Sequence, residues 1–213
     1  MAKHPLWSDE YWLLLMQLYR KRPAGLKPLY YRGLVDLALE LHIRPQFLHQ
    51  QMFRLRQLDS PKLEQLWNKY SKNPQKLSRG VRLLRQMKGF GQANEFYDGV
   101  TIVESWERDF LPIDGRPELT PVKLIMVLDL YFRLTPITMV VETPEVKQLA
   151  RKMKITPATV VEVMDVYKYC DPYINKNEVT SPELLPSCKE IWERYGEDPD
   201  KVAAEAAQLL AYF

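Results

Sequence analysis

The stretch "LARKMKITPATVVEVM", residues 149–164, contains two short helical patterns that meet at a tight corner. Thr156 directly precedes Pro157, an order typical of a helix start, because a short polar side chain caps free N–H groups and proline fits the first helical position. Apolar residues recur three and four positions apart on both sides of that start. They are Leu149, Ala150, Met153, Val160, Val163 and Met164. The stretch predicts two helices that pack against each other across a turn at Ile155.

A similar pattern occurs 112 residues earlier, in "LALELHIRPQFLHQQM", residues 37–52. After Asp59 the offset becomes 125, because the later copy carries extra residues around "YINKNEVTSPELL". The identities are few, but they fall on turn, cap and apolar positions, where physical constraints on residue choice are strongest. Aligned pairs include Leu37 with Leu149, Ile43 with Ile155, Pro45 with Pro157, Trp67 with Trp192 and Tyr70 with Tyr195. We therefore predict a tandem duplication.

Helix starts are marked along the chain by a capping residue followed by proline. The seven pairs are Ser60-Pro61, Asn73-Pro74, Thr120-Pro121, Thr143-Pro144, Thr156-Pro157, Ser181-Pro182 and Asp198-Pro199. With the apolar spacing, they predict an all-α protein with five helices in each copy. The expected ranges are about 9–22, 29–42, 45–58, 61–71 and 74–88, then about 121–134, 144–153, 157–169, 182–195 and 199–212.

The two copies differ in charge and are joined by an acidic segment. Residues 1–88 contain 17 Lys and Arg against 6 Asp and Glu, whereas residues 89–213 contain 13 against 21. We expect a basic helical domain at 5–88, an acidic connector at 89–119 and an acidic helical domain at 120–213. Within the connector, "GVTIVESW", residues 99–106, is the one stretch that favours a strand or short hairpin. A basic half favours a polyanionic partner, or else the two halves attract each other.

The remaining composition favours a globular protein of a reducing compartment. Apolar residues make up 46% of the 213 residues, which allows a substantial core. Cys170 and Cys188 are too few for a disulfide framework and form no metal-binding motif. The N-terminus lacks the order of a secretory signal, and charged residues and a proline interrupt the longest apolar stretch, residues 122–141. We expect a cytoplasmic protein without a membrane segment.

The corner pattern resembles the helix-turn-helix of transcription factors and of the promoter-reading region of sigma factors. The similarity covers about twenty residues in each copy and is specific to no one family. It departs from the pattern at the corner position, usually glycine, which is His42 in the first copy and Lys154 in the second. The resemblance implies that the second helix of the corner reaches base edges in the major groove.

The outward face of that second helix differs between the copies. In the first copy it offers Arg44, Gln46, His49, Gln50, Arg54 and Arg56. Arginine and glutamine suit guanine and adenine edges, respectively. In the second copy, Glu162 and Asp165 are expected on the outer face, where they would repel phosphates. If either copy binds nucleic acid, we predict that it is the first; the alternative is a merely solvated helix surface.

A second candidate for nucleic-acid contact is "LLRQMKGFGQANEF", residues 83–96. Its Lys88, Gly89 and Gly91 resemble the hairpin of helix-hairpin-helix proteins, whose glycine turn offers backbone N–H groups to a DNA phosphate. The match is partial, because Glu95 stands where that family has a small residue. The alternative is that Gly89 ends a helix in a left-handed cap.

The sequence contains no motif typical of an enzyme, a metal site or a cofactor site, so we expect a non-catalytic protein without a cofactor. Four acids of the connector, Glu104, Glu107, Asp109 and Asp114, lack the spacing of a calcium-binding loop. The aromatic boxes at Trp67 and Trp192 are expected to hold the fourth helix of each copy against the fifth.

Two functional hypotheses remain. The first is a regulatory protein that binds DNA, or another nucleic acid, through residues 1–88. Residues 120–213 would then serve for docking to a protein or for self-association. The second is a protein-interaction module in which both corners are structural. On the first hypothesis, the basic residues form one exposed stripe, whereas on the second they are buried against the acidic half or scattered.

Overall fold

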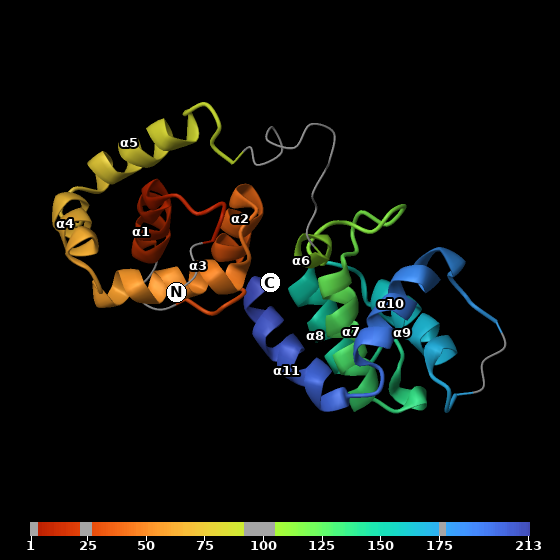
Figure 1. Ribbon diagram of the computed structural model, residues 1–213. Helices are drawn as coiled ribbons and strands as arrows, with labels where there is room; N and C mark the ends of the chain where they lie inside the picture. The colour runs from red at the N-terminus through yellow and green to blue at the C-terminus, as the bar shows by residue number, and fades with distance from the viewer. Residues whose placement is uncertain (1–3, 22–26, 92–104, 175–177) are drawn as a thin grey trace. The chain divides into compact units, whose positions relative to one another are not determined.

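The computed structural model describes residues 4–21, 27–91, 105–174 and 178–213. Within these ranges it contains helices and no β-strand, which confirms the predicted all-α class (Figure 1). One isolated antiparallel bridge joins Ile113 and Arg116. The chain falls into two compact units, unit 1 (residues 1–104) and unit 2 (residues 105–211).

The described residues of unit 1 form five α-helices, which begin and end close to the predicted positions. A short 3-10 turn, Asp9–Tyr11, precedes the first of them, so the α-helical part starts later than expected. The helices are α1 (Trp12–Arg20), α2 (Arg32–Leu41), α3 (Pro45–Gln57), α4 (Pro61–Tyr70) and α5 (Pro74–Arg85).

In the part of unit 2 that the structure describes, the other five predicted helices are present, together with a short additional one. They are α6 (Ser105–Arg108), α7 (Pro121–Arg133), α8 (Pro144–Met153), α9 (Pro157–Cys170), α10 (Leu185–Tyr195) and α11 (Pro199–Leu209). Short 3-10 turns occupy Pro136–Thr138, Pro182–Leu184 and Leu210–Tyr212. The predicted capping is observed at five helix starts, where a side-chain oxygen accepts a backbone N–H. These caps are Ser60, Asn73, Thr120, Thr156 and Asp198.

The later part of the connector expected at 89–119 belongs to unit 2. Residues 105–119 pack with unit 2, because Asp109 accepts two hydrogen bonds of 2.8 Å from Arg194 of α10 and Leu119 is fully buried. Most of the stretch expected as a strand lies outside the described residues, and its last two positions begin α6.

The first long helix of each unit lies in its core. In unit 2, every residue from Leu124 to Tyr131 is buried, and α7 contacts α8, α9, α10 and α11. In unit 1, α1 contacts both α3 and α5, and buries Leu15 and Met16 completely. A helix that is buried on all sides needs neighbours on all sides, so α7 determines how the other helices of unit 2 are arranged.

In the aromatic boxes expected to hold the fourth helix against the fifth, Tyr70 and Tyr195 do contact the fifth helix, through Lys76 of α5 and Lys201 of α11. The tryptophans of the same boxes contact the first helix. Trp67 of α4 meets Tyr19 of α1 at 6.0 Å between ring centroids, and Trp192 of α10 meets Tyr131 of α7 at the same distance. These ring contacts join the fourth helix of each unit to its first helix.

Each corner turns on a residue with left-handed backbone. His42 has φ of 54° and Lys154 has φ of 56°. The next residue then donates its N–H back to the helix, from Ile43 to Ala38 O and from Ile155 to Ala150 O, both at 3.0 Å. This closure satisfies helix-end carbonyls and explains why glycine usually takes the position.

Arg116 holds the segment before α7 against the rest of unit 2. Its guanidinium donates two hydrogen bonds of 2.8 Å to the Glu162 carboxylate, and its Nε donates to Glu118 at 2.7 Å. Ser181, which is buried, donates to Glu162 at 2.6 Å. These hydrogen bonds lower the pKa of Glu162 below its ordinary value of 4.5. The expectation that Glu162 lies free on the outer face is therefore wrong.

Both cysteines belong to unit 2. Cys170, the last residue of α9, is half-buried, and Cys188 of α10 is fully buried. Burial raises the pKa of the Cys188 thiol to about 12 and also raises that of Cys170. Separately, the described helices include none with the length and apolar character needed to cross a membrane.

Replacing Lys154 with glycine should increase the free energy of unfolding by about 0.5–1 kcal/mol, because glycine adopts the left-handed backbone without the steric cost of a Cβ. The matched control is Arg151→Gly, in the right-handed part of α8, which should lower stability by about 1 kcal/mol. Urea denaturation of the full chain measures both. Equal losses for the two variants would contradict a left-handed corner.

Replacing Glu162 with lysine should lower the free energy of unfolding by about 2 kcal/mol, because it removes a paired carboxylate and places a cation beside Arg116. The control Glu190→Lys reverses an exposed charge of α10 and should change stability by less than about 0.5 kcal/mol.

The same comparison has a defined pH dependence. A carboxyl whose pKa is lowered in the folded protein stabilises it above its ordinary value of 4.5, and that contribution is lost as pH falls through the lowered value. The stability gap between the native chain and Glu162→Lys should therefore narrow on acidification, in urea titrations at successive pH values. A gap that stays constant down to the acid transition would contradict the assigned role of Glu162.

Candidate nucleic-acid interface

The predicted recognition helix, α3, buries Leu48, Met52 and Leu55 against α1 and α2, so its opposite face points outward. Of the six predicted contact residues, four are exposed and two are half-buried. The exposed ones are Arg44, Gln46, Gln50 and Arg56, and the half-buried ones are His49 and Arg54. Phe53, which the sequence pattern did not predict as a contact, is exposed on the same face. Its ring packs edge-on against the ring of His49, with 5.2 Å between the ring centroids.

Arg54 already has partners within unit 1. Its Nε donates to Asp59 at 2.7 Å and its Nη1 donates to Gln51 at 3.1 Å. The guanidinium also lies 5.7 Å from the ring centroid of Trp12. Because these contacts hold it against the body of the unit, a base contact by Arg54 would require their rearrangement.

Two other residues of this face fasten α3 to the segment before α2. The Nε2 atom of His49 lies 2.7 Å from the carbonyl oxygen of Lys27, and the amide of Gln46 donates to the Tyr30 hydroxyl at 3.3 Å. Together with Arg54, they give the middle of α3 a structural role. Gln50 and Arg56 remain as exposed predicted contacts of this face, and Arg44 is exposed at its start.

The glycine turn after α5 is folded back onto unit 1. Gly89 and Gly91 both have positive φ, 87° and 65°. A Cβ on Gly91 would lie 2.8 Å from the backbone oxygen of Glu40, so close packing on α2 explains that glycine. Lys88 is exposed, but the second helix of a helix-hairpin-helix would fall outside the described residues.

A further basic surface of unit 1 lies along α5, and of its residues the sequence predicted only Lys88 as a contact. Leu77, Val81 and Leu84 form the buried side of this helix, which packs on α1. Its opposite side and its flanking turns carry exposed cations. They are Lys72, Lys76, Arg79, Arg82 and Lys88. We call these five residues the α5 basic row.

Most of this row is not neutralised within the described chain. The ammonium of Lys76 lies 5.6 Å from the Tyr70 ring centroid. For Lys72, Arg79, Arg82 and Lys88, the structure shows no ion pair with any residue that it describes. Arg85 differs, because it donates two hydrogen bonds, of 2.7 and 2.8 Å, to Glu40 of α2. The row therefore leaves positive charge exposed to solvent.

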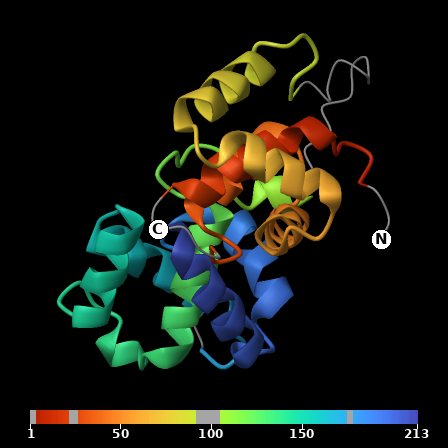
Figure 2. The ribbon, with the colours of Figure 1, turned by 90° about the vertical axis from the view of Figure 1, so that its left-hand side faces the viewer.

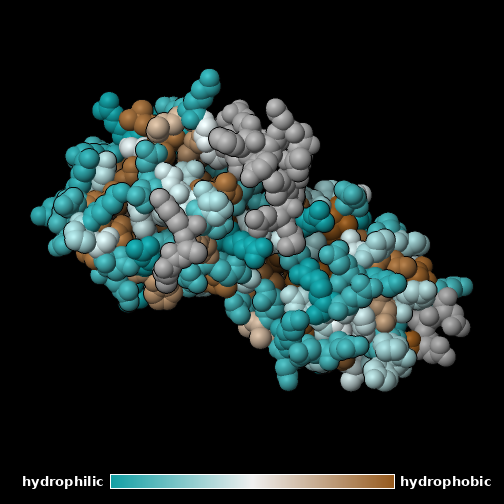
Figure 3. All heavy atoms as spheres, in the orientation of Figure 1, coloured by the Kyte–Doolittle hydropathy of each residue, from teal (hydrophilic) through white to brown (hydrophobic). Residues whose placement is uncertain are grey.

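A sequence signal for this row exists. No Asp or Glu occurs between Glu64 and Glu95, although that interval contains seven Lys and Arg. An open hollow of about 460 Å³ lies on the outer side of α5, lined in part by Arg79 and Arg82. Figure 3 shows mainly hydrophilic residues, with a few hydrophobic ones between them, at the edge of unit 1 where Figure 1 places α5.

The α5 basic row and the α3 face point in different directions. Helix α1 lies between α3 and α5, as Figures 1 and 2 both show, and each outer helix buries its apolar side toward it. Their polar sides consequently face away from each other. The single stripe of basic residues expected for DNA binding is therefore two separate surfaces.

On the corresponding surface of α9 in unit 2, the acidic side chains are paired with other residues of the same unit. Glu162 is paired with Arg116, and Asp165 pairs with Lys168 at 2.9 Å. Among the described residues of both units, no three His, Cys, Asp or Glu side chains are grouped to hold a metal ion.

No family model, curated protein or solved structure matches this chain. The candidate interface therefore depends on the geometry and charge of the chain alone.

Reversing the charge of Arg54 should affect folding, whereas reversing Arg56 should not. Arg54→Glu removes two hydrogen bonds and places a carboxylate beside Asp59, which should lower the free energy of unfolding by about 1 kcal/mol for this partly exposed pair. The control Arg56→Glu, two residues further along the same helix, should change it by less than about 0.5 kcal/mol. Urea denaturation measures both, and equal effects would contradict the structural role of Arg54.

Proposed function

We propose that unit 1 binds nucleic acid, and that the α5 basic row contacts the phosphate backbone. The observation that carries the proposal is the set of exposed cations without ion-pair partners among the described residues, on a segment free of acids. A surface of this kind attracts polyanions because binding neutralises phosphates and releases their counterions.

The spacing of the row suits a backbone contact. Lys76, Arg79 and Arg82 follow one another every three residues, which places them about 4.5 Å apart along the helix axis. Side chains of this length can each reach a different phosphate oxygen. Contacts to phosphates position a protein but carry no sequence information. We therefore expect binding that tolerates many sequences and weakens steeply with salt.

The α3 face remains a candidate for base contacts through Arg44, Gln50 and Arg56. Since the α3 and α5 surfaces face apart, one straight segment of duplex cannot contact both. The proposal assigns the main share of affinity to α5, because the charge there is denser and less neutralised. A contribution from α3 would appear as sequence preference added to that affinity.

We also infer that the units are copies of one ancestral domain with a helix-turn-helix-like corner. Several equivalent features support this inference, including the left-handed corners 112 residues apart and the Tyr–Trp ring pairs. The copies have diverged most on the fifth helix. Where α5 is basic, α11 carries Asp200, Lys201 and Glu205. Nucleic-acid binding is accordingly proposed for unit 1 alone.

A second candidate function, protein interaction through unit 2, is favoured by one observation. The segment between α7 and α8 exposes three apolar side chains, Ile137 (89% exposed), Val140 and Val141. Exposed apolar clusters of this kind favour contact with another protein. This function is compatible with the first, since the two surfaces belong to different units.

Reversing Arg79 and Arg82 together to glutamate should weaken binding to random-sequence duplex DNA by at least about tenfold at low salt, because two phosphate contacts become repulsive. The native chain should show a steep fall in affinity with salt, and the variant a shallower one. Fluorescence anisotropy across a salt series measures both.

Two controls carry the same change of charge. Lys147→Glu with Arg151→Glu, on exposed positions of α8, should affect affinity only weakly through net charge. Arg44→Glu with Arg56→Glu tests α3 directly. Loss of binding in the α3 pair but not in the α5 pair would refute the assignment to α5, and no binding of native protein at low salt would refute the function.

A further inference from the structure

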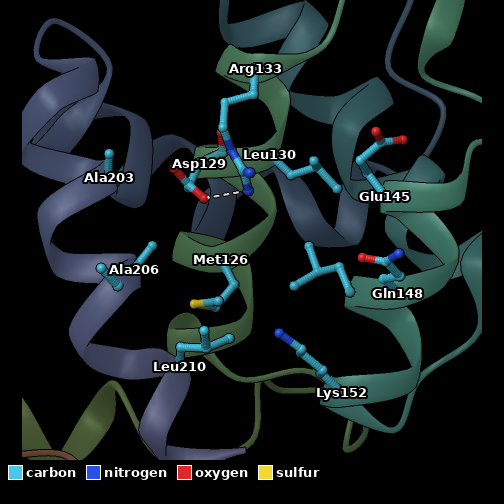
Figure 4. Close-up of a pocket in the computed structure, with 12 residues that line it drawn as sticks. Met126, Asp129, Leu130, Arg133, Glu145, Gln148, Lys152, Ala203, Ala206 and Leu210 are labelled. Atoms are coloured by element: carbon cyan, nitrogen blue, oxygen red, sulfur yellow. Dashed lines mark hydrogen bonds and ion pairs between the residues drawn. The ribbon is translucent and has the colours of Figure 1, made fainter.

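Unit 2 contains a pocket of about 330 Å³ between α7, α8 and α11 (Figure 4). Its walls are mainly apolar, and four charged side chains stand around them. The apolar lining includes Met126, Leu130, Leu149, Ala203, Ala206 and Leu210, and the charged residues are Asp129, Arg133, Glu145 and Lys152. This volume lies at the lower end of the range of small-molecule sites.

Unit 1 has a smaller pocket, of about 200 Å³, at the equivalent place. Eight of its lining residues match lining residues of the unit 2 pocket at the offset of 112, from Leu14 with Met126 to Glu40 with Lys152. The ninth, Arg85, matches Leu210 at the offset of 125. The hollow is therefore a shared feature of the two units, and its differences in side chains distinguish them.

The main difference is an ion pair across the mouth. In unit 1, Arg85 extends from α5 to Glu40 of α2, with both oxygens of the carboxylate engaged at 2.7 and 2.8 Å. In unit 2, the same two positions hold Leu210 and Lys152, which cannot form such a pair. The mouth of the unit 2 pocket consequently lacks that bridge.

Lys152 supplies an unsatisfied positive charge at this mouth. Figure 4 shows its side chain extending from α8 over the pocket, toward the side of Met126 and Leu210. It has no hydrogen bond or ion pair with a residue that the structure describes. Glu145 lies two turns away on the same helix, about 10 Å along the axis, which is too far for a direct pair.

The other cation of the pocket is already neutralised. Arg133 folds back along α7 and donates to the buried Asp129 carboxylate at 2.7 Å (Figure 4). This leaves Lys152 as the cation that a negatively charged ligand would meet. The apolar walls of α7 and α11 would cover the remainder of such a ligand.

We infer that this pocket binds a small organic carboxylate with an apolar body. The carboxylate pairs with Lys152, and so takes the place that the Glu40 carboxylate has in unit 1. The apolar body lies against Met126, Leu130 and the alanines of α11. This site is independent of the α5 basic row and of nucleic-acid binding.

The test uses 4-phenylbutyrate as the probe and 4-phenylbutanol as its uncharged counterpart, titrated into the full isotope-labelled chain and followed by amide chemical shifts. We expect saturable shifts confined to α7, α8 and α11, and a dissociation constant for the acid about tenfold lower than for the alcohol, as an ion pair of about 1.4 kcal/mol gives. In Lys152→Met this preference should disappear, whereas it should persist in Lys147→Met, an exposed lysine of α8 outside the pocket.

A second variant removes the Lys152 cation and also closes the mouth of the pocket. Lys152→Glu combined with Leu210→Arg installs the ion pair of unit 1 across the mouth, and should abolish probe binding while the amide spectrum stays folded. The inference is overturned by any of three results: no saturable shifts in the native chain, equal affinity for acid and alcohol, or undiminished binding in the bridged variant.

Discussion

The burial of one helix on every side constrains the structure of unit 2. Helix α7 exposes almost nothing between Leu124 and Tyr131, so four neighbouring helices must close around it. Such burial removes apolar surface from water along the whole helix and leaves little freedom for its neighbours. The surrounding helices are then free to vary on their outer sides, where the charge differences between the two units occur.

The helices were predictable because their starts are local. A capping side chain and a following proline act within one turn, and five of the seven predicted caps are observed as hydrogen bonds. The sequence also predicted the position of each corner, but the left-handed backbone of His42 and Lys154, where glycine is usual, became visible only in the structure. Residues 105–119 could not be placed by such rules, because ion pairs between residues distant in sequence, such as Asp109 with Arg194, attach them to unit 2.

The candidate interface was less predictable than the fold, for a related reason. Helical spacing identified the outer face of α3 correctly, but spacing does not show which charges are already paired. Arg54 has Asp59 as a partner, and Glu162 has Arg116. The segment around the α5 basic row lacks acidic residues, which is visible in the sequence. The resemblance to a helix-turn-helix nevertheless predicted that α3 makes the contact. The exposure of each cation and its ion-pair partners are visible only in the structure. Together they move the candidate interface from α3 to α5.

The positions of the two cysteines allow thiol labelling to measure the local unfolding of unit 2. The chain has no other cysteine, so every thiol belongs to unit 2. Only a thiolate reacts with common labelling reagents, and burial keeps Cys188 protonated as well as covered. Labelling of Cys188 must therefore wait for α10 to separate from its neighbours. The rate at which this one sulfur becomes modified measures how often unit 2 unfolds locally, while unit 1 contributes no signal.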